Sequence, residues 1–430
     1  METLNKKDDY QHKISAKRLF NTLCLGAALL MTGCTSNDTT PPLKEEAVQF
    51  TLPQPSGSYK IGTTELHLVD HDRPDPWKEE KKREIMINVW YPAQNDYKGK
   101  FAPYMRPKAA AQFEKASLAS LGINPNEVDL GRSMTHAFLN APVAVSNNRY
   151  PVVLYSPSIG TPRSFGTVNV EELASRGYIV VTIDHTYETS VVEFPDDRIE
   201  VASLPELDAE VLKKVIDTRI SDVRFVLDQL QVIQNNGNPD AENRHLPIGL
   251  SDALDLSRVG MFGHSAGGFT AAEAMNNDQR IDAGINLDGS LGYHVGNGDL
   301  GEVTETGLDR PFMIMGAGTS GSENLPHTHL NSPDWKLFWE NSSEWKLDLY
   351  IPDGEHYSFV DHQVIVPQLV EKLDLPDMGL EQMLGTVDPD QIVASQRAYI
   401  TAFFDEHLKN KPQRLLKQPS PSHPDVVFVE

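Results

Sequence analysis

The sequence contains little cysteine. Only Cys24 and Cys34 occur among its 430 residues, so everything after position 34 must fold without a disulfide bond. A share of 39% hydrophobic and 23% charged residues is typical of a globular protein, and the chain is long enough to bury a substantial core. That core must be held by noncovalent packing, even in an oxidising compartment.

Positive charge is scarce as well. The 38 Lys and Arg residues are outnumbered by 61 Asp and Glu residues, which gives a formal net charge of −23. Such a charge repels the phosphates of nucleic acids and of anionic membranes, so we expect no nucleic-acid partner. The acidic surplus itself most simply indicates a solvated surface. No apolar run reaches about 18 residues, so attachment to a membrane would need a cause other than a spanning helix.

The N-terminal segment offers such a cause. Basic residues precede a short apolar run over 19–31, as in a secretory signal peptide. The sequence that follows, Thr32-Gly33-Cys34, resembles a bacterial lipobox, although Met31 replaces the more usual leucine before it. The resemblance implies a signal peptide over 1–33, lipidation of Cys34 and export as a lipoprotein, with Thr35 favouring the outer membrane. A plain signal peptide or a buried apolar helix is the alternative.

A polar segment and a large folded region follow. Residues 34–54 are rich in Ser, Thr, Pro and Glu and lack hydrophobic periodicity, which predicts a flexible tether. We expect one large domain over 55–415, with an insertion at about 93–150, and a short tail over 416–430. Short helical pieces in the insertion, such as 109–121, indicate either a partial lid or plain scaffold.

Hydrophobic periodicity predicts the class of fold. Alternating apolar and polar residues over 59–69 and 85–91 indicate antiparallel strands at the start of the domain. Further on, strand-like apolar runs alternate with helical segments. The runs are 151–155, 178–183, 259–263, 283–287, 311–315 and 345–351, and the helical segments are 167–175, 211–233, 266–275, 365–373 and 391–407. This order predicts an α/β fold with a mostly parallel, doubly wound sheet.

One pentapeptide carries the chemistry. Gly263-His264-Ser265-Ala266-Gly267 has the pattern G-x-S-x-G, which composition alone would produce in roughly one protein of this size in ten. The context strengthens it, because a buried strand precedes the motif and a helix follows. In an α/β-hydrolase this strand-turn-helix exposes a serine hydroxyl, and the helix N-terminus favours an oxyanion. We therefore predict that Ser265 is the nucleophile of a serine hydrolase.

A serine nucleophile needs two partners. An imidazole must take its proton, and a carboxylate must fix the tautomer of that imidazole, in the chain order serine, acid, histidine. His356 follows the last predicted strand and is the candidate base. For the acid, Asp288 ends the strand after the nucleophile helix, whereas Glu323 lies near the commoner position one strand later. Spacing alone leaves both acids open.

The order of several motifs resembles that of a known family. The stretches that carry the resemblance are Val89-Trp90-Tyr91-Pro92-Ala93, residues 151–160 (PVVLYSPSIG), residues 173–181 (LASRGYIVV), the elbow, Leu287-Asp288 and Gly354-Glu355-His356. Over roughly 59–407 the chain resembles the secreted type of platelet-activating factor acetylhydrolase and its bacterial relatives. The resemblance implies an α/β-hydrolase fold with antiparallel N-terminal strands and a helical insertion.

The resemblance also implies roles for individual residues. Ser265 corresponds to the nucleophile, Asp288 to the acid and His356 to the base. The backbone amides of Ile159 and Ala266 correspond to the donors that stabilise the oxyanion. The sequence departs from the family in the oxyanion loop, where Pro157-Ser158 replaces the common His-Gly pair.

Two other histidine positions are candidates for a functional role. His185 follows a strand end that faces the site in related proteins, but a packed structural histidine is the favoured interpretation. His327-x-His329 is a weak zinc signal on its own, and no cluster of ligands or phosphate-binding loop accompanies it. We therefore expect neither a metal nor another cofactor.

The resemblance implies hydrolysis of short-acyl or oxidised phospholipids through an acyl-enzyme. A lipid ester is thus the expected partner, and a lipid anchor would keep the enzyme at a membrane. General carboxylesterase, lipase and polyester hydrolase activities are the alternatives within the same chemistry. An alternative of another class is a binding lipoprotein that keeps the fold without turnover.

Overall fold

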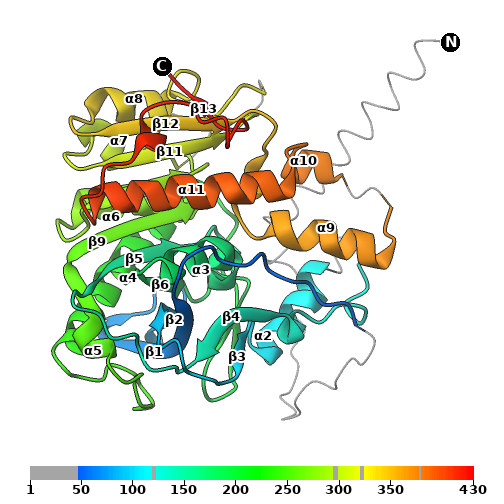
Figure 1. Cartoon of the computed structure of the whole chain (residues 1–430), viewed down its shortest axis with the longest axis vertical. Helices are drawn as coiled ribbons and strands as arrows, with labels where there is room; N and C mark the ends of the chain where they lie inside the picture. Colours follow the sequence, from blue (N-terminus) through cyan, green and yellow to red (C-terminus); the bar gives the residue numbers. More distant parts are fainter. Residues whose placement is uncertain (1–46, 119–122, 294–298, 320–323, 377–378) are drawn as a thin grey trace.

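A computed structural model describes residues 47–118, 123–293, 299–319, 324–376 and 379–430 (Figure 1). The predicted signal peptide, Cys34, Thr35 and the alternative acid Glu323 lie outside the described residues. Within the described residues, eleven strands form one sheet in the order β13-β12-β11-β10-β9-β5-β6-β2-β1-β4-β3, and a separate hairpin joins β7 and β8. The sheet is the frame on which the predicted site residues are placed.

The middle of the sheet is parallel, as the alternation of strands and helices predicted. Its strands are β5 (Tyr150–Ser156), β6 (Ile179–Asp184), β9 (Leu254–His264), β10 (Ala283–Leu287), β11 (Phe312–Ala317) and β12 (Lys346–Ile351). β5 is buried on both faces, which is why it reads as a continuous apolar run. The two predicted N-terminal strands are β1 (Lys60–Pro74) and β2 (Lys82–Ala93), and they pair antiparallel.

Helices cover both faces of the sheet. Alternate residues of β5 point to opposite sides, so Val152 and Leu154 pack with α4 and α6, whereas Val153 and Tyr155 pack with α3 and α11. In Figure 1, α11 crosses the near face of the sheet from one side to the other. The covering helices are α3 (Thr167–Ser175), α4 (Ala209–Gln234), α6 (Ala266–Asn277), α7 (Glu302–Thr306), α8 (Pro333–Asn341) and α11 (Pro389–His407). This arrangement is the α/β-hydrolase fold.

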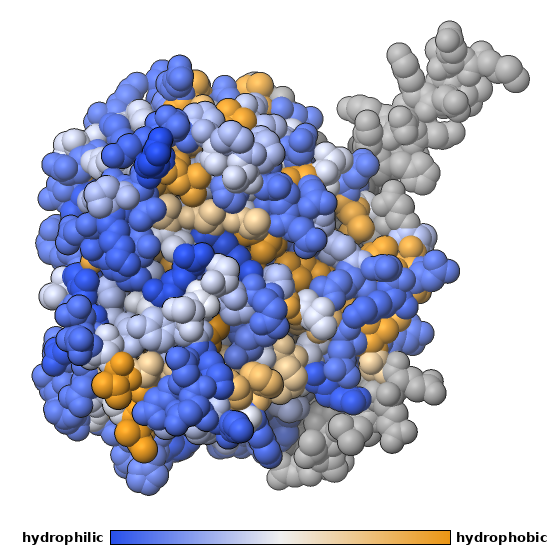
Figure 2. Space-filling view, in the orientation of Figure 1, coloured by the Kyte–Doolittle hydropathy of each residue, from blue (hydrophilic) through white to orange (hydrophobic). Residues whose placement is uncertain are grey.

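The remaining elements are short or peripheral. They are α5 (Leu250–Ala253), α9 (His362–Leu373), α10 (Leu380–Leu384), β7 (Val191–Glu193), β8 (Ile199–Val201) and the 3₁₀ helices η2 (Leu130–Arg132), η3 (Arg163–Gly166), η4 (His356–Phe359) and η5 (Arg414–Leu416). None of the helices in the described residues combines the length and hydropathy that crossing a bilayer requires. The face seen in Figure 2 is mostly hydrophilic, and its apolar surface is divided into small separate patches.

The predicted helical insertion is only partly helical. It contains α2 (Pro107–Phe113) and one π-helical turn, η1 (Glu114–Leu118), but also β3 (Phe101–Pro103) and β4 (Met134–Leu139). β4 pairs with β1 and β3 pairs with β4, so this segment widens the main sheet. The strands were missed because β3 is three residues long and because β4 is stabilised by its neighbour rather than by a strong pattern of its own.

Both predicted ends of the domain need correction. The tether expected over 34–54 is wrong from Val48 onward, because Phe50 and Leu52 are only 2% and 6% exposed and pack against Tyr104 and Phe165. The tail expected over 416–430 also belongs to the folded body, since β13 (Val427–Phe428) pairs antiparallel with β12. In both places a few apolar residues find a hydrophobic surface that local composition does not reveal.

Candidate active site

Ser265 occupies a strained turn between β9 and α6. Its backbone has φ 56° and ψ −123°, a conformation that non-glycine residues adopt only when the surrounding structure enforces it. A Cβ atom added at Gly267 would collide with the backbone of Ser156 on the neighbouring strand, so only glycine fits there. The turn is therefore locked, and it leaves Ser265 partly exposed at the end of the strand.

The same edge of the sheet carries Asp288. The amide of Ser265 donates to the carbonyl of Leu287 at 2.9 Å, and Asp288 follows directly, with its own φ at 53°. Its Oδ1 atom accepts the amide of Ala317, at the end of β11, at 2.8 Å. Asp288 follows β10 but is thus held by the end of the next strand, β11. The commoner position for the acid lies after β11.

His356 contacts the other carboxylate oxygen of Asp288. It begins η4 after β12, and its Nδ1 atom lies 2.5 Å from Oδ2 of Asp288. The side chain of His356 is 34% exposed, whereas that of Asp288 is 4% exposed. Burial alone raises the pKa of Asp288, but the adjacent imidazoles of His327 and His356 outweigh it and hold the pKa below its ordinary value. Asp288 is therefore an ionised carboxylate in a largely dry position.

His264 ties the elbow to the loop that carries His356. Its Nε2 atom donates to the carbonyl of His356 at 2.8 Å, and the two rings lie 4.5 Å apart between centroids. Because Ser265 is the next residue, the structure brings the predicted nucleophile, acid and base to one place at the carboxyl edge of the sheet. These residue types in this arrangement can carry out nucleophilic acyl transfer.

The two predicted oxyanion donors lie on neighbouring strand ends. Ala266 is the first residue of α6, where an amide has no partner within the helix and the helix dipole favours negative charge. Ile159 follows β5, and Ser156 at the end of β5 pairs with Gly263 at the end of β9. Across the described part of the chain, neither amide has a protein acceptor, so both remain available to a developing oxyanion.

A buried ion network lies beneath the loop that carries Ile159. Arg219 on α4 donates from Nη1 to the carbonyl of Pro157 at 2.6 Å and from Nε to Glu188 at 2.7 Å. The carbonyl of Glu188 in turn accepts the amide of Gly160 at 3.1 Å. The loop is thus held on both sides of Ile159, and sequence analysis missed this because α4 reads as an ordinary amphipathic helix.

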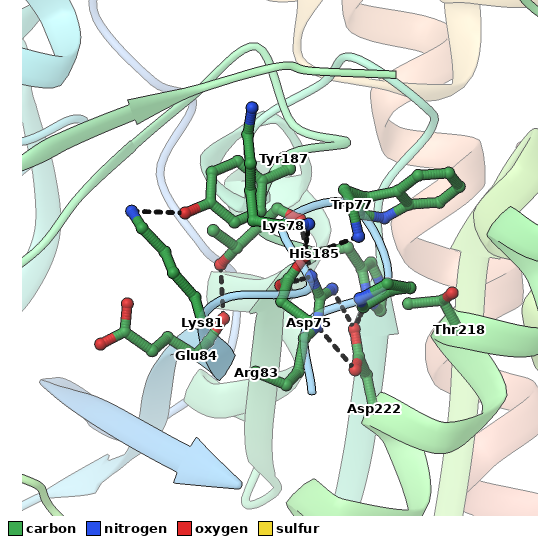
Figure 3. A network of polar contacts seen from close by, with 12 residues as sticks. Asp75, Trp77, Lys78, Lys81, Arg83, Glu84, His185, Tyr187, Thr218 and Asp222 are labelled. Atoms are coloured by element: carbon green, nitrogen blue, oxygen red, sulfur yellow. Dashed lines mark hydrogen bonds and ion pairs between the residues drawn. The ribbon is translucent and has the colours of Figure 1, made fainter. Parts of the chain in front are cut away.

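His185 belongs to the same network. Its Nδ1 lies 2.9 Å from Asp222 and its Nε2 2.9 Å from the hydroxyl of Ser156. Figure 3 shows Arg83 between Asp75 and Asp222, with His185 beside Asp222, and all four side chains are buried. Burial, with the nearby charge of Arg219, lowers the pKa of His185 to about 4. A neutral histidine with a hydrogen-bond partner at each ring nitrogen agrees with the packed structural role that the sequence analysis favoured.

The two histidines of the weak zinc signal bind different carboxylates. His327 Nδ1 lies 2.8 Å from Asp288, and His329 Nδ1 lies 2.6 Å from Asp348. Among the residues that the structure describes, no three His, Cys, Asp or Glu side chains are grouped to hold a metal ion. The contact of His327 with Asp288 was not foreseen. Its position after β11, next to the strand that carries Asp288, is the signal that could have indicated it.

Comparison with known proteins places the chain among esterases. The family described as "Platelet-activating factor acetylhydrolase, isoform II" matches residues 45–413. A "Probable 1-alkyl-2-acetylglycerophosphocholine esterase" of Arthroderma benhamiae is 28% identical over 401 residues, which cover 89% of this chain and 94% of that protein. The "Platelet-activating factor acetylhydrolase" of Cavia porcellus is 22% identical over 339 residues, which cover 75% and 72%.

A solved structure shows the same fold. The ferulic acid esterase from Streptomyces cinnamoneus superimposes with a TM-score of 0.70 at 33% sequence identity, covering 89% of this chain and all of that one. The likeness therefore extends over most of the chain.

Proposed function

Because the chain belongs to the platelet-activating factor acetylhydrolase family, we propose that it cleaves short-acyl or oxidised phospholipids, with Ser265 as the nucleophile. The chain is an α/β-hydrolase and an ester hydrolase. The observation that carries the residue assignment is the 2.5 Å contact between His356 Nδ1 and Asp288 Oδ2 beside the elbow. It leaves Nε2 of His356 as the ring nitrogen that can accept a proton.

The proposed reaction assigns one step to each of these groups. His356 takes the proton of the Ser265 hydroxyl as the oxygen attacks the ester carbonyl, and the carbonyl oxygen becomes an oxyanion that the amides of Ile159 and Ala266 bind. Asp288 holds the imidazolium. His356 then returns the proton to the departing alcohol, and an acyl-enzyme remains. His356 then takes a proton from water, which attacks the acyl-enzyme, and returns this proton to the oxygen of Ser265 as the carboxylic acid leaves.

The substrate class rests on the relatives. The Arthroderma protein is named for an acetylated alkyl glycerophosphocholine, which is a short-acyl phospholipid. The structural neighbour is named for ferulic acid esters, which favours a general carboxylesterase as the second candidate. Nitrophenyl esters of two to sixteen carbons, then phospholipids with acetyl or long sn-2 chains, then feruloyl esters would separate the two candidates. A sharp preference for acetyl phospholipid supports the first, and a preference for long chains or feruloyl esters overturns it.

A fluorophosphonate probe tests the chemistry itself. Covalent labelling of the folded protein that disappears in Ser265→Ala supports the proposed nucleophile. Absence of labelling in the unmodified protein, with its fold intact by circular dichroism, would favour the binding lipoprotein instead.

We further propose that the protein is exported and anchored by a lipid on Cys34, in the outer membrane. The short apolar run and the Thr32-Gly33-Cys34 sequence support this assignment. Growth with an alkynyl palmitate should label the unmodified protein. The Cys34→Ala variant should stay unlabelled and should appear in the soluble periplasmic fraction. Recovery of the unmodified protein in that soluble fraction would contradict the anchor.

A further inference from the structure

Asp288 contacts two imidazoles, and the reaction above uses only one of them. His356 Nδ1 lies 2.5 Å from Oδ2, and His327 Nδ1 lies 2.8 Å from Oδ1. The amide of Ala317 also donates to Oδ1, at 2.8 Å. Both carboxylate oxygens are therefore occupied, and the carboxylate plane is fixed between two rings.

The ring of His327 is itself rigidly held. Its side chain is 7% exposed, and it stacks on Trp335 with ring centroids 3.9 Å apart and planes 23° apart. The amide of His327 donates to Ala317 at 3.0 Å, and the indole of Trp335 donates to the carbonyl of Gly289, the residue after Asp288, at 2.8 Å. Trp335 therefore links the histidine to the backbone that presents the acid.

The surroundings of His327 are acidic. Asp288 after β10, Asp334 on α8 and Asp348 on β12 all act on its ring. Burial alone lowers the pKa of His327, but these three carboxylates outweigh it and hold the pKa above its ordinary value. Three further groups interact electrostatically with the carboxylate of Asp288, namely His356, Glu355 and His264. His327 thus presents a positive charge toward Asp288 over a wider range of pH than a free imidazole would.

We propose that His327 is a positioning residue of the active site, which holds Asp288 toward His356 and offsets part of the carboxylate charge. This inference rests on the proposed triad. It gives a role to one member of a histidine pair whose sequence pattern weakly indicated zinc. Because a positive charge on His327 compensates part of the charge of Asp288, less of that negative charge is left to stabilise the imidazolium of His356 during the reaction.

The chain supplies a matched control in His329. This second histidine also bonds a buried carboxylate through Nδ1, that of Asp348, and also stacks on a tryptophan, Trp339, with centroids 4.3 Å apart. Asp348 lies within β12 and makes no contact with His356 among the described residues. Replacing His329 therefore repeats the packing change without touching the acid of the triad.

The test compares His327→Asn with His329→Asn. An asparagine amide can donate from nearly the position of Nδ1 but carries no charge. For His327→Asn we expect the acidic limb of kcat/KM on a soluble nitrophenyl ester to move upward by about half to one pH unit. The resulting loss of kcat/KM is about three- to tenfold at pH values below the limb and small at pH values above it. His329→Asn should leave the limb in place.

Two results would overturn the proposal. One is a limb that does not move in His327→Asn, and the other is an equal shift in both variants, which would indicate a general effect of packing. A spectroscopic readout separates this proposal from the proposed reaction. In the Ser265→Ala background, where turnover is absent, the ¹⁵N-histidine titration of His356 should still move upward with His327→Asn. If the unmodified enzyme shows neither turnover nor labelling, the titration alone decides the role of His327.

Discussion

The guanidinium of Arg219 lies 2.6 Å from the carbonyl oxygen of Pro157, so a buried cation on α4 holds the loop that carries Ile159. The charge of Arg219 is paired with that of Glu188, which accepts its Nε at 2.7 Å. The position of the Ile159 amide, the proposed oxyanion donor, therefore depends on a pair of fully buried charges.

Replacing Arg219 should reduce turnover more than substrate binding. Arg219→Met removes the donor to Pro157. We expect kcat to fall about 10- to 100-fold with little change in KM. This loss is smaller than the roughly 10²–10³-fold that is typical when an oxyanion donor is removed outright. The variant also leaves Glu188 buried without its cation, which costs about 3–5 kcal/mol of folding free energy. The double variant Arg219→Met/Glu188→Gln removes both charges and should recover most of that stability but not kcat. Full kcat in a folded double variant would contradict the role of the loop.

Substitution of Ser265 should separate chemistry from strain. Ser265→Ala and Ser265→Gly should both lose at least about 10⁴-fold in kcat, because no nucleophile remains. Alanine keeps the unfavourable φ of 56°, whereas glycine adopts it freely, so the glycine variant should be the more stable by about 1 kcal/mol. Urea unfolding of the two variants measures the difference, and equal midpoints would mean that the turn stores no strain.

Replacing Asp288 should reduce activity more than the small change in the side chain suggests. In Asp288→Asn the amide can present a donor to Nδ1 of His356 and fix the wrong tautomer, so we expect kcat to fall about 10⁴-fold. Thermal stability should fall by a few degrees. Activity within tenfold of the unmodified enzyme would transfer the acid role to another carboxylate, for which Glu323→Gln is the direct check.

Asp361 should make stability depend on pH. It is buried, accepts from Tyr104 and the amide of Val168, and burial raises its pKa from 3.8 to about 7. A raised pKa means that its contribution to stability is complete below about pH 4 and is lost as the pH rises through 7. Asp361→Asn removes this loss, so the variant should gain in melting temperature relative to the unmodified protein between pH 5 and pH 8. If the melting temperatures of the two proteins change in parallel over that pH range, the role of Asp361 in the pH dependence is refuted.

The N-terminal segment should contribute to folding. Phe50 is buried against Tyr104, with ring centroids 4.9 Å apart, so Phe50→Ala should cost about 3 kcal/mol. Gln54→Ala, at an exposed position nearby, should cost less than about 0.5 kcal/mol. Denaturant midpoints compare them, and similar values for the two variants would show that the segment is only loosely docked.

Most of the parallel sheet could be predicted because its signals are local. β10 and α3 have the predicted bounds. β9 begins five residues earlier than expected, because residues 255–258 are only partly buried or exposed and so interrupt the apolar pattern after Leu254. Ser265 was identified because an elbow requires a strand, a turn and a helix in immediate succession. The order of the chain then restricted His356 to the loop after the last parallel strand.

The features that were missed depend on distant partners. β4 is stabilised by β1, and Phe50 is buried by residues more than fifty positions away, so neither has a signal in its own segment. The choice of Asp288 came from the family resemblance rather than from spacing. His327 and Arg219 gain their meaning only when β11 and α4 are placed beside the strand ends, which a single sequence does not show.

The very short outer strands of the sheet have a consequence for the protein at high concentration. β13 is two residues long, and β3 is three residues long and ends in Pro103, which has no amide hydrogen to donate. Each rim therefore offers few free backbone groups for strand addition by another molecule, a common route to aggregation. At high concentration, copies of this enzyme should therefore stay separate instead of growing into fibrils.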